Sequence, residues 1–296
     1  MICSDARRVV AEQKRAGYDV IKVYNQLSNE AYVALTEAAK QNNIAVVGHV
    51  PRTVGVERAL KAGQAMIAHG EEYFFTYFDC KECGRDRKPD ESKIPTIVQA
   101  TLAAGAAVMP NLSFIAATRR QLDNLESVLT DPETKYLRPQ VLSMWKSQNP
   151  TNRPKLEKFD EREKVKYPFV QKLTKALSDA GVLLLLGTDS SAPGLFPGQS
   201  AQLELRELVN AGLTPYQALT TATRNAGQFI SERVRPTEKF GTIAIGQRAD
   251  LILLSGNPLE SIDNISKLVG VMARGQWLPT AKLHAMRDSV AASYKN

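Results

Sequence analysis

Four side chains that could take part in metal or acid–base chemistry each follow a short apolar run of the sequence. They are Lys22, His49, His69 and Asp189, at the ends of runs that begin near residues 19, 44, 65 and 183. Two imidazoles and a carboxylate suit a divalent metal such as zinc, which lowers the pKa of bound water toward neutrality. We therefore predict that these side chains converge on one site that activates water.

Each of these side chains also has a plainer structural interpretation. A single histidine at a strand end is often a hydrogen-bonded structural residue, and Gly187-Thr188-Asp189 is also a common turn sequence. Lys22 stands apart because an ammonium group repels a cation and is costly at a buried strand end, so it could instead be a salt-bridged lysine. The occurrence of all four at the ends of successive apolar runs favours the functional interpretation.

The apolar runs have the length of buried strands, and helix-like segments separate them. The candidates at positions 22, 49 and 69 recur about every 20 to 27 residues, the repeat of one strand plus one helix in a β/α barrel. The run before the last candidate is four leucines long, residues 183–186, and predicts a strand buried on both faces that ends at a buried Asp189. Residues 105–112 predict a further strand without a charged end.

These patterns predict an α/β fold, the later strands of a TIM-like (β/α)8 barrel with a small β-sandwich appendage. We expect the partial barrel over residues 1–232, with a helical insertion at about 113–168 that is either a solvated insertion or a lid over the barrel mouth. Short strands with glycine turns predict the β-sandwich over 233–280, and 281–296 predict a C-terminal helix.

Composition narrows the classes of partner. The chain has 296 residues, 43% of them apolar, which is enough for a large core. The 38 Lys and Arg residues exceed the 31 Asp and Glu residues by seven, but acids lie between the bases, and no basic stripe carries interleaved aromatics. We therefore expect no nucleic acid partner. No apolar run approaches the ~18 residues of a membrane span, so we expect no membrane association, and the sequence does not indicate a compartment.

Two of the three cysteines, Cys80 and Cys83, form a single CxxC pair. A structural zinc site needs a second such pair, which this sequence does not offer. A loop disulfide or two unreactive thiols is the favoured interpretation.

Six stretches of the sequence resemble the amidohydrolase superfamily, and in particular its branch of imidazolonepropionase-like enzymes and metal-dependent Xaa-Pro and Xaa-Arg dipeptidases. The resemblance covers nearly the whole chain except the insertion and rests on residues 19–24, 47–51, 67–69, 187–190, 212–225 and 246–251.

The resemblance implies a role for each candidate. Lys22 would carry a carboxylated amine that bridges two divalent metals, most often zinc, while His49 and His69 would bind one of them. Asp189 would act as a metal ligand and as the general base on the bridging water. A buried lysine loses its proton easily, and the neutral amine is the form that reacts with carbon dioxide. The implied substrate is a small molecule with an amide-like C–N bond, such as an N-acyl amino acid, a dipeptide or a cyclic amide.

Two tyrosines are candidates for substrate contact. Tyr24 lies two residues after Lys22, on the same strand face, and Tyr73 follows His69. Each also has a packing interpretation, since a tyrosine ring fills a core well.

One departure from the family pattern shapes the expected function. The family opens with a His-x-His on its first barrel strand, whereas the histidines here are His49, His69 and His284. We therefore expect that the first strands, two metal ligands and part of the small β domain are absent. Two hypotheses follow: a metal-dependent amidohydrolase, or a catalytically incomplete C-terminal portion that needs a complementary chain or a homo-oligomer.

Overall fold

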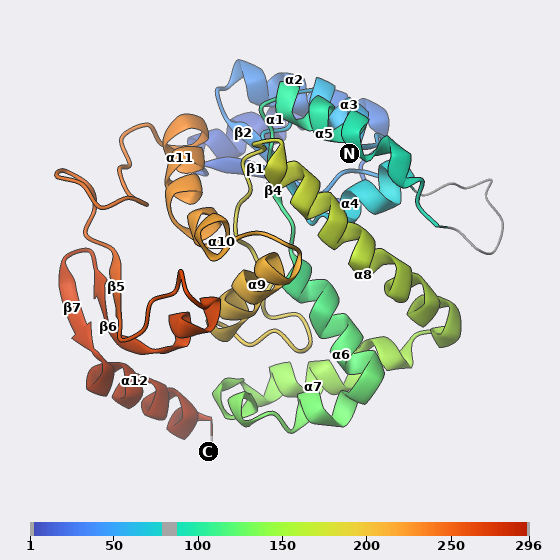
Figure 1. The fold of residues 1–296 in the computed structure, drawn as a ribbon. Helices are drawn as coiled ribbons and strands as arrows, with labels where there is room; N and C mark the ends of the chain where they lie inside the picture. The colour runs from blue at the N-terminus through green and yellow to red at the C-terminus, as the bar shows by residue number, and fades with distance from the viewer. Residues whose placement is uncertain (1–2, 79–87, 295–296) are drawn as a thin grey trace. The chain divides into compact units, whose positions relative to one another are not determined.

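A computed structural model describes residues 3–78 and 88–294 of the chain (Figure 1). The predicted Cys80 and Cys83 pair lies outside these residues. Within them, no helix combines the length and the apolar character needed to cross a membrane.

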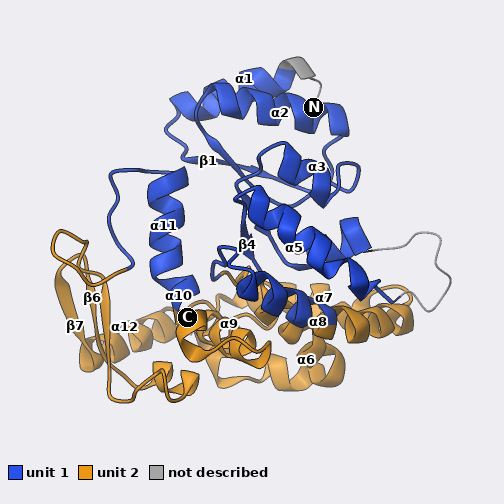
Figure 2. Ribbon diagram, turned by 45° about the horizontal axis from the view of Figure 1, so that its top comes forward, with its two compact units in different colours: residues 1–110, 169–186, 220–241 blue, residues 111–168, 187–219, 242–296 orange. Residues whose placement is uncertain are grey.

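The chain divides into two compact units (Figure 2). Unit 1 comprises Met1–Pro110, Phe169–Leu186 and Thr220–Gly241, and unit 2 comprises Asn111–Pro168, Gly187–Leu219 and Thr242–Asn296. The predicted insertion at about 113–168 falls within the first segment of unit 2, and the predicted domain boundaries at 232 and 280 stay predictions.

Unit 1 is built on a parallel sheet with the strand order β1-β2-β3-β4. Its strands are β1 (Val20–Val23), β2 (Ala45–Gly48), β3 (Met66–Ala68) and β4 (Ala107–Met109). The helices of the crossovers and flanks are α1 (Cys3–Arg15), α2 (Asn29–Gln41), α3 (Val56–Lys61), α4 (Glu71–Tyr73), the π-helix η1 (Phe74–Phe78), the 3₁₀ turn η2 (Glu91–Lys93), α5 (Ile94–Ala103) and α11 (Arg224–Arg233). This alternation confirms the predicted TIM-barrel-like α/β fold, although the barrel is not closed within the described residues.

The run of four leucines forms less of a strand than predicted. Leu184 makes one isolated parallel bridge with Val108 of β4, where the amide of Leu185 donates to the Val108 carbonyl at 2.9 Å. The next amide, that of Leu186, donates at 3.1 Å to the carbonyl of Thr221 instead. The prediction of a regular strand here is therefore wrong, because its hydrogen bonds leave β4 after one bridge.

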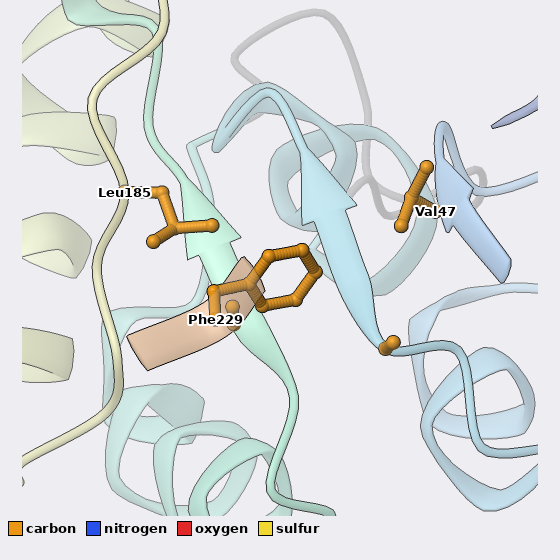
Figure 3. Close-up of a cluster of buried hydrophobic side chains, with 5 residues drawn as sticks. Val47, Leu185 and Phe229 are labelled. Atoms are coloured by element: carbon orange, nitrogen blue, oxygen red, sulfur yellow. The ribbon is translucent and has the colours of Figure 1, made fainter. Parts of the chain in front are cut away.

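A cluster of apolar side chains fills the interior of unit 1. It joins β2, the residue just before β3, β4, the leucine run and α11, and consists of Val47, Ala65, Ala107, Leu185 and Phe229 (Figure 3). Burying a side chain the size of leucine or phenylalanine stabilises a fold by about 1.5–3 kcal/mol. The interior of unit 1 beside the sheet is therefore packed with apolar side chains, and the candidate polar residues lie on or after the strands rather than in this cluster.

Unit 2 is mainly helical. Its elements are α6 (Leu112–Leu129), η3 (Pro132–Tyr136), α7 (Pro139–Gln148), η4 (Pro150–Asn152), α9 (Gln199–Asn210), η5 (Ile262–Ser266) and α12 (Thr280–Ser293). Two further helices pass from unit 2 into unit 1, α8 (Leu156–Asp179) after Pro168 and α10 (Pro215–Ala222) after Leu219. Its core cluster contains Val128, Leu137, Trp145 and Phe196. The indole of Trp145 donates to the carbonyl of Ser191 at 3.0 Å, so the buried aromatic also ties the segment after Asp189 to α7.

The predicted short strands with glycine turns form an antiparallel sheet of three strands, β5 (Leu251–Leu254), β6 (Leu268–Ala273) and β7 (Gln276–Pro279), in the order β5-β6-β7, and the β-sandwich domain over 233–280 stays a prediction. Its strands carry exposed apolar side chains, including Ile252, Leu253 and Trp277. The predicted C-terminal helix is α12.

A buried carboxylate caps the amino end of α6. The two oxygens of Glu204, on α9, accept the amides of Leu112 at 3.1 Å and Ser113 at 2.6 Å. The positive end of the helix dipole and these two amides stabilise the anion. Burial is the larger effect and raises the pKa of Glu204 to about 7.

This pKa predicts a pH dependence of stability. Because the folded pKa of about 7 lies above the ordinary 4.5, the contribution of Glu204 is fully present below about pH 4.5 and is lost as the pH rises through 7. We expect the free energy of unfolding to fall more between about pH 5 and 8 in the wild type than in Glu204→Gln, which cannot ionise. Urea unfolding at several pH values measures this, and equal slopes for the two proteins would contradict it.

The last residue of β2, Gly48, predicts a second effect on stability. Its φ is +115°, and a Cβ there would stand 2.6 Å from the carbonyl oxygen of Val23 in β1. Gly63 also has a positive φ, +82°, but a Cβ there meets nothing within 4 Å. We expect Gly48→Ala to lower the free energy of unfolding by at least about 2 kcal/mol more than Gly63→Ala, because only the first adds a backbone clash to the strain.

Chemical denaturation of both variants measures the difference. Equal losses would show that the approach of β1 to β2 at Gly48 does not constrain the sheet.

Candidate metal centre

Two histidines stand side by side at the carboxyl ends of β2 and β3. His49 follows Gly48 and His69 follows Ala68, and the two strands pair in parallel with Gly48 opposite Ile67. The ring centroids lie 4.5 Å apart with the planes inclined by 46°. The exposed fractions of the two residues are 9% and 6%, so both imidazoles are buried. The structure therefore brings these two candidates together at one edge of the sheet.

Backbone contacts fix the position of each histidine. The amide of His49 donates to the Val23 carbonyl at 3.1 Å, which extends the β1–β2 ladder by one residue. His69 has a left-handed backbone, with φ 68°, and its carbonyl accepts the amide of Glu72 at 2.9 Å. The two rings are thus held by strand pairing and by a closed turn.

Gly70 allows β3 and β4 to approach closely just after His69. Its amide donates to the carbonyl of Pro110, the residue after β4, at 2.9 Å. A Cβ at Gly70 would lie 2.8 Å from the Cγ1 of Val170 on α8 and 3.3 Å from the Pro110 carbonyl oxygen. A larger residue here would push the end of β3 away from its neighbours.

Tyr24 lies at the same edge. Its ring centroid is 4.3 Å from that of His49, with the planes inclined by 56°. Its exposed fraction is 59%, so most of the ring does not serve core packing.

Lys22 lies on β1 opposite Val47 of β2, and its side chain is exposed. The sequence led us to expect a buried lysine, which this placement does not bear out, because the side chains of β1 alternate and Lys22 takes an outward position between the buried Ile21 and Val23. Its Cγ lies 3.0 Å from where a Cβ on Gly48 would stand. The lysine stem thus passes beside the residue that precedes His49.

Tyr73 lies in the core of unit 1. It is completely buried, and its hydroxyl forms a hydrogen bond of 3.0 Å with the hydroxyl of Thr101 on α5. Burial raises the pKa of Tyr73. This placement favours the packing interpretation of Tyr73 over substrate contact.

Asp189 belongs to unit 2 and is exposed. The expectation of a buried carboxylate is wrong, because the leucine run makes a single bridge and residues 185–189 after it have no regular secondary structure. Asp189 has a left-handed backbone with φ 56°, and the amide of Ser190 donates to the hydroxyl of Thr188 at 3.3 Å.

The histidine pair fits a divalent metal as two of its ligands. Neutral imidazole nitrogens are common zinc ligands, and two adjacent buried rings can direct one nitrogen each toward a shared ion. Across residues 3–78 and 88–294, no group of three or more His, Cys, Asp or Glu side chains is placed to hold a metal.

A buried carboxylate that pairs with an exposed guanidinium follows the histidines in the sequence, and the apolar runs did not predict it. Glu72, three residues after His69, is almost fully buried, and burial raises its pKa to about 7. An oxygen of Glu72 lies 3.8 Å from the Nη1 of Arg52, whose guanidinium stands 4.1 Å above the ring of Phe75. The sequence spacing could have indicated this pair, because Arg52 comes three residues after His49 and Glu72 comes three residues after His69.

Solved structures share this fold. A bottromycin amidohydrolase superposes with a TM-score of 0.72 at 24% identity, covering 98% of this chain and 62% of that protein. A Xaa-Pro dipeptidase with bound methionine gives a TM-score of 0.62 at 20% identity, covering 94% of this chain and 59% of that protein. The chain thus spans about three fifths of the length of each.

Sequence comparisons agree with the fold. The imidazolonepropionase of Deinococcus deserti is 42% identical over 81 residues, which are 27% of this chain and 19% of that enzyme. The sequence profile of the amidohydrolase family matches residues 20–278, most of the chain, from the first residue of β1 into β7. The chain therefore belongs to the amidohydrolase family.

Proposed function

We propose that the protein is a metal-dependent hydrolase that cleaves a C–N bond in a small molecule, such as an N-acyl amino acid, a dipeptide or a cyclic amide. The observation that carries the proposal is the pair of buried imidazoles, 4.5 Å apart, at adjacent strand ends. The names of two similar proteins, an amidohydrolase and a dipeptidase, support this kind of bond.

His49 and His69 would hold a divalent metal, and their nitrogen donors suit zinc. When bound, such a metal lowers the pKa of a coordinated water and polarises the carbonyl to be cleaved. Lys22, with its stem beside Gly48, would serve as the carboxylated bridge to a second metal.

Asp189 would accept a proton from the attacking water and return it to the leaving nitrogen. Its exposure supports this role, since an accessible carboxylate can exchange protons with water and substrate. Tyr24 would contact the substrate, because its exposed ring lies against His49.

A second candidate function is that of a catalytically incomplete portion that works only with a complementary chain or as a homo-oligomer. The exposed apolar side chains on β5 and β7, among them Ile252, Leu253 and Trp277, favour it. Within the part of the chain that the structure describes, β5 and β7 are the two edges of this sheet, and such edges are normally paired or covered. In this case metal chemistry would still centre on the histidine pair, but the isolated chain would bind one metal tightly.

The two candidates are tested together with zinc-loaded protein. If the chain is a complete hydrolase, Asp189→Asn should lower kcat on N-acyl amino acids or dipeptides by on the order of 10²-fold or more, without a change in melting temperature. Asp288→Asn, which removes an exposed carboxylate on α12, is the matched control and should keep full activity.

The metal content of the same samples decides between the candidates. One metal per chain with little or no hydrolysis supports the incomplete portion. Two metals per chain, with robust activity that Asp189→Asn abolishes, would rule it out, whereas robust activity that survives Asp189→Asn would remove Asp189 from the mechanism.

A further inference from the structure

The side-chain amide of Asn111, two residues after the end of β4, is buried without a hydrogen-bond partner among the described residues. Asn111 follows Pro110, is only 2% exposed, and has a left-handed backbone with φ 55°. Neither its Oδ1 nor its Nδ2 has a hydrogen-bond partner among the residues that the structure describes. A buried polar group without a partner typically costs about 1–3 kcal/mol, so its retention calls for an explanation.

The usual local role of this asparagine is taken by another residue. Asn111 is the N-cap of α6, a position where an asparagine oxygen normally accepts an amide of the first turn, but its side chain makes no such bond. Both oxygens of Glu204 accept those amides instead, from Leu112 and Ser113. The helix end is therefore already satisfied, and the amide of Asn111 remains available for a ligand.

The position of Asn111 in the chain is that of a ligand-binding residue. In parallel β/α folds, binding side chains gather after the carboxyl ends of the strands. Ala68 of β3 pairs with Met109 of β4, and the carbonyl of Pro110, the residue just before Asn111, accepts the amide of Gly70. Asn111 thus comes two residues after the end of β4, whereas His69 directly follows the end of β3.

The chemistry of the amide limits what it can bind. On one edge, the amide of Asn111 offers its oxygen acceptor beside one of its two N–H donors, so a ligand group that pairs with both needs a donor beside an acceptor. A trans peptide bond directs its N–H and its carbonyl to opposite sides and can satisfy only one of the two. A cyclic amide is cis, and its N–H and carbonyl face the same way.

We propose that Asn111 is a specificity-determining residue that binds a cyclic amide through two hydrogen bonds, in which Nδ2 donates to the ring carbonyl and Oδ1 accepts the ring N–H. This inference rests on the proposed function for the hydrolysis of the bound cyclic amide. The binding of the cyclic amide to Asn111 itself needs no metal.

Two matched lactams test the proposal by binding to the metal-free protein. The probes are 2-piperidone, which has a ring N–H, and N-methyl-2-piperidone, which lacks it, with Kd measured by NMR titration. We expect the wild type to prefer 2-piperidone by at least about tenfold, because methylation removes one hydrogen bond and leaves Oδ1 unpaired. The side-chain amide signals of Asn111 should shift with 2-piperidone in particular.

Asn111→Gly removes the amide and tolerates the positive φ, so it should abolish the preference. Asn43→Gly is the matched control, since Asn43 also has a left-handed backbone, with φ 47°, and is exposed, and this variant should keep the preference. Equal affinity for the two lactams, no binding of either, or a preference that survives in Asn111→Gly would overturn the proposal. Failure of hydrolysis in the zinc-loaded protein, with this preference intact, would count against the proposed function alone.

Discussion

The parallel pairing of β2 with β3 is the constraint on which the candidate site depends. Parallel strands end at the same edge of a sheet, so His49 and His69, which directly follow the paired strands β2 and β3, lie at one edge. Close backbone approach keeps this edge in place, since the absent Cβ atoms of Gly48 and Gly70 leave room for β1 and for Val170. The chemistry of the two imidazoles therefore follows from strand pairing that neither histidine itself provides.

The burial of two carboxylates is the second constraint. Glu72 follows His69 in the sequence, and Glu204 contacts the residues that follow Asn111. Glu72, after β3, and Glu204, which caps α6, both have a pKa raised to about 7 by burial. Each has compensation, a guanidinium for Glu72 and two backbone amides for Glu204. Because Glu204 satisfies the helix end, Asn111 need not do so. The cap that Glu204 provides thus leaves the side-chain amide of Asn111 available for a ligand.

Much of this arrangement could be predicted from sequence where the signal is local. The apolar runs that end in His49 and His69 predict both the strands and the placement of the two histidines at one edge of the sheet, because parallel strands end at the same edge. Asp189 shows where local pattern fails: four leucines predict a buried strand, but the amide of Leu186 pairs with Thr221, a partner that the run itself does not reveal.

Other features depend on contacts between distant parts of the chain. The hydroxyl of Tyr73 is satisfied by Thr101, 28 residues further on, and the cap of Leu112 comes from Glu204, 92 residues away. The availability of the Asn111 amide follows only from that second contact. Lys22 was predicted correctly as a strand residue, but whether it lies on the buried or the exposed face of β1 depends on how neighbouring elements cover the sheet.

The most direct test of the metal centre is a crystal of the protein soaked in zinc, with diffraction recorded at the zinc absorption edge. We expect an anomalous peak about 2.1 Å from one ring nitrogen of His49 and one of His69. We also expect additional density on the Nζ of Lys22, as a carboxylated amine would give. Zinc bound elsewhere, with no peak between the two imidazoles, would contradict the central claim, and an unmodified Lys22 beside such a peak would contradict the bridging role alone.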